Sequence, residues 1–281
     1  MKKPKELKKH VLERLMCCWG ESCAVFFIIS GELAVVALAV MLAYDYLEDF
    51  SSVDFPVWLA AGITALLAAG LWLAVAPFAY GVRWYSIQQI RGNAVFARSM
   101  FSCYASLKKM LQVLKLNSIL TLRRLPAFIL ICGAVFAEFY MVNEAGMVIG
   151  QDSVLYTASA VLMLFLAAIG FCFYMVLGLK YAPVPYLYAL EPASSPKEII
   201  AKSKRIMKNN SRYIVETMCS MAGWLLLCIL IFPMVFILPY SQMVYTAAIN
   251  EIIEQEDKKE INADNERHER KLTSNRIQRP R

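Results

Sequence analysis

The chain has 281 residues, of which 59% are hydrophobic and only 18% are charged. A water-soluble domain usually has about 45–50% apolar and about 25% charged residues, so the composition argues against one and indicates an integral membrane protein. The net charge of +7 would suit nucleic acid as well as an anionic membrane. The basic segments adjoin long apolar ones, however, so we expect lipid rather than nucleic acid to be the partner.

The N-terminal segment 1–22 is basic, and its part 5–16 has the pattern of an amphipathic helix on the cytoplasmic side. The apolar run that follows, 23–44, is too long for the core of a cleaved signal peptide and contains Glu32. We therefore expect an uncleaved membrane helix there.

A helix needs about 20 mostly apolar residues to cross the hydrocarbon core of a bilayer. Four runs meet this requirement: 23–44, 57–82, 125–142 and 154–179. The region 214–253 is interrupted by Pro233 and Pro239, and its length suits two short spans, 214–232 and 235–253. A single crossing of this region stays open.

The distribution of lysine and arginine favours two crossings. The 29 cations fall into four blocks, with six in 1–22, eight in 83–124, seven in 180–213 and eight in 254–281. Connectors 45–56 and 143–153 contain none. Cytoplasmic loops carry the excess of positive charge, so all four blocks belong on the cytoplasmic side. The predicted fold is therefore an all-α polytopic membrane protein with about six transmembrane helices and both termini in the cytoplasm.

Two further cytoplasmic segments are predicted to form basic amphipathic helices. In 97–116 a stripe repeats at helical spacing: Met100, Tyr104, Leu107, Leu111 and Leu114. The second helix begins after Ser195, with Pro196 at its first position and Glu198 completing a capping box. Its apolar side repeats at helical spacing: Ile199, Ile200, Ser203, Ile206, Met207 and Asn210. Its cations are predicted to form a membrane-surface basic face: Lys197, Lys202, Lys204, Arg205 and Lys208.

Such a helix lies on the anionic inner leaflet or packs against the ends of the spans. The final segment, 254–281, mixes both charge signs and has few large apolar residues, so we expect a charged tail that is frayed or disordered. The tail and the basic face are the places where a protein partner would dock.

Two stretches resemble an uncharacterised family of bacterial multi-pass membrane proteins (domain of unknown function 975). They are "YAPVPYLYALEPASSPKEIIAKSKRIMKNN" and "SMAGWLLLCILIFPMVFILPYSQMVYTAA". The matching positions are Tyr186, Tyr188, Glu191, Pro192, Ser203, Met207, Asn209, Gly223, Trp224, Pro239 and Tyr240, with Pro77, Gly81, Arg91 and Gly92 upstream. The resemblance covers about 75–245 and implies a bacterial plasma membrane protein with no established activity. The chain departs from the family pattern near Gly178, where Pro-Gly is absent, and at "IFPM", which replaces a glycine-rich turn.

No catalytic or metal-binding pattern stands out. The only histidines, His10 and His268, lie in charged terminal segments, which argues against histidine-based zinc sites and catalytic triads. The eight cysteines form no CxxC pair, and most lie in apolar runs, where a thiol behaves as a small hydrophobic group. Acylation of the adjacent Cys17 and Cys18 is the alternative. We expect no cofactor and no enzymatic activity.

Two acidic residues lie within predicted spans. Glu32 is about ten residues inside the first span, close to the bilayer midplane, and Glu138 lies nearer the outer face. A carboxylate at such depth must be protonated, be hydrogen-bonded or face the bundle interior. The pair forms a candidate intramembrane polar site.

The sequence thus predicts a non-enzymatic membrane protein that serves as a scaffold or as a subunit of a transport or envelope assembly. The alternative is an autonomous carrier or channel that uses Glu32.

Overall fold

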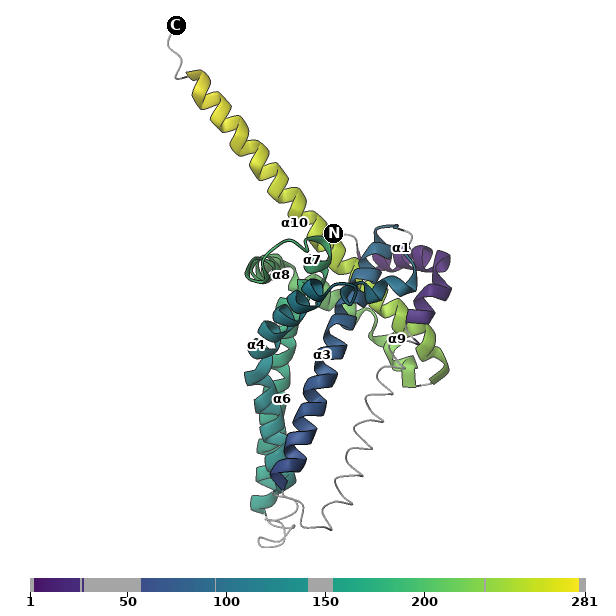
Figure 1. Cartoon of the computed structure of the whole chain (residues 1–281), viewed down its shortest axis with the longest axis vertical. Helices are drawn as coiled ribbons and strands as arrows, with labels where there is room; N and C mark the ends of the chain where they lie inside the picture. The colour runs from purple at the N-terminus through teal and green to yellow at the C-terminus, as the bar shows by residue number, and fades with distance from the viewer. Residues whose placement is uncertain are drawn as a thin grey trace.

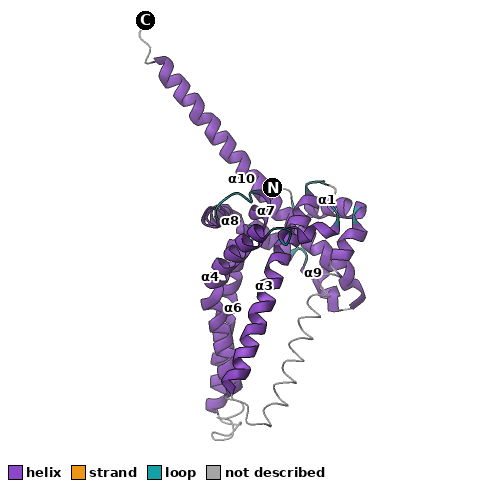
Figure 2. Ribbon diagram, in the orientation of Figure 1, coloured by secondary structure: helices purple, strands orange, loops and turns teal. Residues whose placement is uncertain are grey.

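The computed structural model describes residues 3–25, 27, 57–93, 95–140, 154–229 and 231–277. Every regular element in these ranges is a helix, which confirms the predicted all-α class (Figure 2). Three long helices extend in the same direction from the region where the shorter helices gather (Figure 1). They are α3 (Val57–Ile90), α4 (Leu107–Tyr140) and α6 (Val154–Tyr181).

Helix α3 contains the predicted span 57–82 and continues to Ile90. Its 34 residues correspond to about 50 Å, which exceeds the hydrocarbon thickness of about 30 Å. Its last turns pack against η1, the 3-10 helix Ala97–Cys103. A Cβ atom on Gly81 would lie 1.6 Å from the carbonyl oxygen of Met100, so this contact requires glycine. Gly81 therefore fixes how closely the loop after α3 approaches the helix.

The range 97–116 differs from its predicted form. It is not one surface helix: η1 and a turn are followed by α4, which runs without a break through Pro126 into the predicted third span. Of the predicted apolar stripe, Met100 and Leu114 are buried. The other three members are exposed: Tyr104, Leu107 and Leu111. The basic segment and the span are thus a single helix.

Helices α4 and α6 pack along their length, with a close approach at Gly170, whose added Cβ would lie 2.9 Å from Ile131 Cγ1. Two apolar stretches of the described residues, Leu107–Val135 and Ala158–Leu190, are long and apolar enough to cross a membrane. Only 17% and 11% of their most apolar windows are buried. The core helix of a water-soluble protein would be mostly covered, whereas these helices expose large side chains such as Leu164 and Phe165.

The shorter helices enclose a hydrophobic core in the region where α3 and α6 end and α4 begins (Figure 1). They are α1 (Pro4–Cys17), α7 (Val184–Leu190), α8 (Pro196–Cys219) and part of α10 (Ile231–Ile277). We call α1, α7, α8 and residues 243–253 of α10 the platform. Its buried side chains include Leu7, Val11, Leu15, Tyr186, Leu187, Ile206, Ile214, Val244, Ile249 and Ile252. The predicted helix 5–16 is confirmed as α1, and its apolar side faces this core.

The predicted start of α8 is confirmed. The Ser195 hydroxyl accepts a hydrogen bond from the Glu198 backbone N–H at 3.3 Å, and the Glu198 carboxylate accepts one from the Ser195 N–H at 3.1 Å. The predicted apolar side is also confirmed, because five of its positions are buried: Ile199, Ile200, Ser203, Ile206 and Met207. The sixth, Asn210, is half-buried.

The structure does not confirm 214–232 and 235–253 as two spans. Helix α8 continues to Cys219, and Ile214 is fully buried in the platform. The chain then forms α9 (Ala222–Leu226), η3 (Leu227–Ile229) and the start of α10. These elements make a short hairpin, residues 222–242, that ends well short of the far ends of α3, α4 and α6 (Figure 1). The first half of the hairpin, α9 and η3, has about eight residues, or roughly 12–16 Å of helical rise. That length is about half of what a membrane crossing needs.

Helix α10 has 47 residues, or about 70 Å, and runs through Pro239. It leaves the hairpin, crosses the platform and projects away from the rest of the molecule (Figure 1). The predicted last domain, the charged tail 254–281, is helical as far as Ile277. We call residues 261–277 the arm. Pairs one turn apart support it, such as Arg270–Glu266 at 3.4 Å.

Candidate functional site

Helices α8 and α10 are joined by ion pairs where α10 leaves the platform. Lys202 Nζ on α8 lies 2.6 Å from Glu191 Oε1 and 3.1 Å from Asp257 Oδ1. Arg205 lies nearby, paired with Glu256 at 3.7 Å and with Glu260. Together these pairs clamp the base of the arm to α8.

The clamp favours the protonated form of Lys202. Burial by itself lowers the pKa of Lys202, but hydrogen bonds to Glu191 and Asp257, together with their negative charges, raise it by more, so the net shift is upward. Within the platform, the Tyr213 hydroxyl of α8 donates a hydrogen bond to Glu251 of α10 at 2.9 Å. Burial and then this carboxylate raise the pKa of Tyr213 above its ordinary value.

The five cations of the predicted basic face are therefore not equivalent. Two of them, Lys202 and Arg205, are engaged by carboxylates of the α7–α8 connection and α10. Lys204 lies over the Tyr181 ring, with its Nζ 5.8 Å from the ring centroid. Lys197 and Lys208 are exposed and remain available to a membrane surface.

The candidate intramembrane acids are not brought together in the described residues. Glu32 lies outside the described residues, and Glu138 belongs to α4, two residues before its end, with a side chain that is likewise outside the description. The carrier that uses Glu32 stays a prediction.

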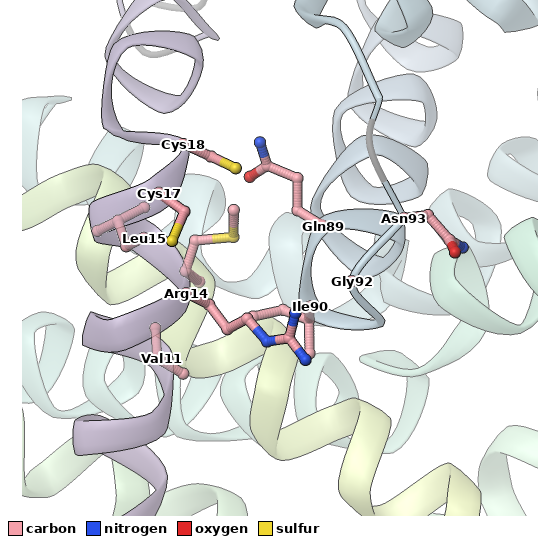
Figure 3. Close-up of a pocket in the computed structure, with 10 residues that line it drawn as sticks. Val11, Arg14, Leu15, Cys17, Cys18, Gln89, Ile90, Gly92 and Asn93 are labelled. Carbon is pink, nitrogen blue, oxygen red and sulfur yellow. The ribbon is translucent and has the colours of Figure 1, made fainter.

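A small cavity of about 210 Å³ separates α1 from the end of α3 (Figure 3). Arg14, Cys17 and Cys18 line it from the N-terminal side, and Gln89 and Asn93 from the opposite side. Gln89 is held in place by hydrogen bonds, accepting one from Ser22 at 3.3 Å and donating one to Tyr85 at 2.5 Å. The thiols have no base in the wall of this cavity that would activate them, so nucleophilic catalysis is not supported here.

A second, more polar cavity of about 380 Å³ lies between α1 and α10. Arg91 Nε donates to Asn250 Oδ1 at 2.9 Å, and Asn250 Nδ2 donates to Glu254 Oε1 at 2.7 Å. These two bonds join three polar side chains of its wall to one another. Within the described ranges, no three histidine, cysteine or acidic side chains gather in a way that would hold a metal ion.

The chain has no match among protein-family models, curated proteins or solved structures. The resemblance to domain of unknown function 975 accordingly stays an expectation.

The most unusual polar arrangement lies where α3, α4 and α10 converge. The Tyr80 hydroxyl on α3 and Arg124 Nε on α4 are both buried without a hydrogen-bond partner in the described part of the chain. The charges of Arg83 and Arg124 both act on the Tyr80 hydroxyl and on that of Tyr245 from α10. We call Tyr80, Arg83, Arg124 and Tyr245 the arginine–tyrosine cluster.

No described acidic side chain neutralises these arginines. The cations in the ion pairs of the described residues are Lys202, Arg205, Arg212, Lys259, Arg267 and Arg270. Arg83 instead donates to the Ala79 carbonyl of its own helix at 2.8 Å, and Arg124 lies over the Tyr174 ring, 5.9 Å from its centroid.

Sequence reasoning treated these arginines only as topological signals and missed the cluster. A usable signal was present, because residues 57–137 contain eight lysines and arginines and no aspartate or glutamate. Such a segment has no counter-charge of its own, so its cations must find one elsewhere in the fold, in water or in a ligand.

Proposed function

We propose that the chain is a membrane-anchored scaffold whose arm presents a helical docking surface to a cytoplasmic protein partner. It is a non-enzymatic, multi-pass component of a bacterial plasma membrane, acting within a transport or envelope assembly. The observation that carries this proposal is the course of α10, which is rooted in the platform, clamped by α8 and exposed along residues 261–268.

Exposed apolar surface supports the membrane placement. The apolar side chains of α4 and α6 face outward along most of their length, which is unfavourable in water and favourable in lipid. Helices α3, α4 and α6, with the predicted span 23–44, give four crossings. Residues 1–22, 83–124, 180–213 and 254–281 then all lie in the cytoplasm, as their positive charge requires.

The composition of the arm supports partner docking. It carries both charge signs and lacks a repeated apolar seam, so it is not suited to pair with a second copy as a coiled coil. Among the side chains that the structure describes in the arm, the large exposed apolar one is Ile261, which is 59% exposed and lies next to the clamp. A partner that covers Ile261 and pairs with the flanking charges would gain both apolar burial and specificity.

The test is partner capture from native membranes in mild detergent, comparing the full chain with a truncation that ends at Glu260. The truncation keeps every clamp residue, including Glu260 itself. We expect a stoichiometric protein to be recovered with the full chain and lost with the truncation and with Ile261→Glu. Recovery of the same partner with both variants, or of no partner with the full chain, would reject the scaffold function.

Ala263→Glu serves as the matched control for Ile261→Glu, because it adds the same charge to an exposed position of the same helix. It should retain the partner if the contact is centred on Ile261.

A further inference from the structure

We infer that the arginine–tyrosine cluster, together with the seam between α4 and α6, binds the phosphate headgroup of an anionic phospholipid from the inner leaflet. This inference rests on the membrane placement in the proposed function, but not on the arm or its partner.

The first argument is the unmet bonding capacity of the cluster. Tyr80 is only 4% exposed, and its hydroxyl has no hydrogen-bond partner within the described residues. The Nε atom of Arg124 is also buried without a hydrogen-bond partner within the described residues, although the side chain as a whole is half-buried. Buried polar groups are nearly always paired in folded proteins, so two unpaired groups in one cluster indicate a missing ligand.

The second argument is charge. A guanidinium group stays protonated in proteins, so Arg83 and Arg124 cannot reduce the cost of burial by losing a proton. Neither is paired with a described carboxylate, and both act on the same tyrosine hydroxyls. An exogenous anion would satisfy both. The N–H groups of the two guanidinium groups and the tyrosine O–H are hydrogen-bond donors, and a phosphate group offers several acceptor oxygens to them.

The third argument is the position of the cluster in the bilayer. Arg124 lies two residues before Pro126, at the predicted cytoplasmic end of the third span. Arg123, which precedes Arg124 in α4, and Lys204 are exposed, and both lie over the Tyr181 ring. Arg123 also donates a hydrogen bond to the Tyr181 hydroxyl at 3.3 Å. Lipid headgroups lie at this level, so a lipid phosphate would meet the half-buried Arg124 side chain from the surface, and contact with the buried Tyr80 hydroxyl would require a local side-chain movement.

The fourth argument selects a lipid over a free anion. Below the Arg124–Tyr174 contact, the α4–α6 seam opens into an apolar groove of about 390 Å³ lined in part by Val135, Met163 and Ala167. Val135 lies 11 residues from Arg124 and Met163 lies 11 residues from Tyr174, so each is about three turns away on the same face of its helix. That distance is about 16 Å, close to the thickness of one leaflet of the hydrocarbon core. An acyl chain attached to the bound phosphate would therefore run along the surface of the α4–α6 pair, past the close contact of Gly170 with Ile131, and reach the groove.

The experiment measures thermal unfolding of the full-length protein in a mild neutral detergent during titration with defined lipids. Long-chain phosphatidylglycerol is compared with phosphatidylcholine of the same chains, with dihexanoyl phosphatidylglycerol and with inorganic phosphate. Long-chain phosphatidylglycerol should raise the unfolding temperature most. In Arg124→Gln the concentration needed should increase about ten-fold, because a charge-assisted phosphate contact is lost.

Two further variants separate the loss of lipid binding from a loss of stability. Tyr80→Phe should require about three-fold more lipid, yet without lipid its unfolding temperature should equal or exceed that of the wild type, because an unpaired buried hydroxyl has been removed. Lys115→Gln removes one exposed charge from α4 outside the cluster and should titrate like the wild type. A loss of folding in Arg124→Gln would leave the Tyr80→Phe comparison to decide.

Each alternative outcome has a defined meaning. Equal titration of the wild type, Arg124→Gln and Tyr80→Phe would overturn the site. Equal effects of phosphatidylcholine and phosphatidylglycerol would overturn its selectivity for an anionic lipid. An equal effect of inorganic phosphate would overturn the assignment to a lipid, although an anion site would remain. Recovery of the protein in the soluble fraction would reject the membrane placement, whereas loss of partner capture alone would leave the lipid site intact.

Discussion

At the scale of single residues, Gly81 shows how one missing side chain determines local packing. Any Cβ at this position would overlap the Met100 carbonyl, and backbone cannot move aside as a flexible side chain can. Gly81→Ala should therefore destabilise the protein by at least about 2 kcal/mol through displacement of η1 from α3. Gly70 on the same helix has no described atom within 4 Å of its Cβ position, so Gly70→Ala should be neutral or stabilising. Thermal unfolding in detergent compares the two variants, and equal destabilisation would contradict the close contact.

Lys202 tests the clamp between α8 and α10. Lys202→Met should cost about 1 kcal/mol, because the two carboxylates that lose their partner are partly exposed and regain water. Lys197→Met is the matched control on the same helix, with an exposed side chain. Limited proteolysis of α10 reports the result directly. Cleavage near Asp257 should be faster only in Lys202→Met, and equal rates in the two variants would argue against the clamp.

The same clamp should fail at alkaline pH. Both Lys202 and Tyr213 have a pKa that is raised in the folded state, so the stability linked to them is fully present below their unfolded values, about 10.4 and 10. It is lost as the pH rises from these values through the folded pKa. We therefore expect stability to fall from about pH 10 upward, and to fall less steeply in Tyr213→Phe. Unfolding temperatures measured by circular dichroism between pH 8 and 11.5 test this, and parallel curves for the two proteins would refute it.

At the scale of elements, local signals predicted α8 well. The capping box and the helical repeat of apolar side chains depend only on neighbouring residues, and both are found as expected. The same holds for α1 and for the continuous helix over 57–82. Their boundaries were less predictable, because α3 and α4 continue from apolar into basic sequence without a break in the backbone.

The region 214–253 shows where composition misleads. Its apolar residues were assigned to lipid, but Ile214, Val244 and Ile249 are buried in the platform instead. A high hydropathy indicates that a side chain is unfavourable in water. It does not indicate whether that side chain lies in the protein interior or in lipid. The charge rule could not correct the assignment, since no crossing and two crossings of 214–253 return the tail to the same side. The arginine–tyrosine cluster was inaccessible for a related reason: it joins residues from three helices that only the fold brings together.

Cysteine labelling can determine the path of the hairpin. In a protein whose eight native cysteines have been replaced, Leu227→Cys lies at the turn of the hairpin, and Gln151→Cys lies in the predicted outer connector 143–153. A membrane-impermeant maleimide added to intact cells should label Gln151→Cys and not Leu227→Cys, because the hairpin is too short to reach the outer surface. Labelling of both positions would restore the six-span topology.

At the scale of the whole molecule, the arm should be dispensable for folding. Residues 261–268 are exposed, and the last clamp contact is made by Glu260. Truncation after Glu260 should therefore change the unfolding temperature by less than about 2 °C, since surface changes away from packing contacts have small effects. Truncation after Ile249, which removes both the clamp carboxylates and the buried Ile252 and Ile253, should destabilise the platform strongly. Similar unfolding temperatures for the two truncations would contradict the division of α10 into root and arm.

The continuity of α10 makes it a mechanical link across the molecule. One helix joins the hairpin at one end to the arm at the other, and α8 grips it between them at Lys202 and Arg205. A sideways push on the hairpin would therefore reach the arm through the α10 residues that are packed in the platform, 243–253. The molecule thus has a continuous helical connection between the hairpin and the arm, and this connection passes through the core of the platform.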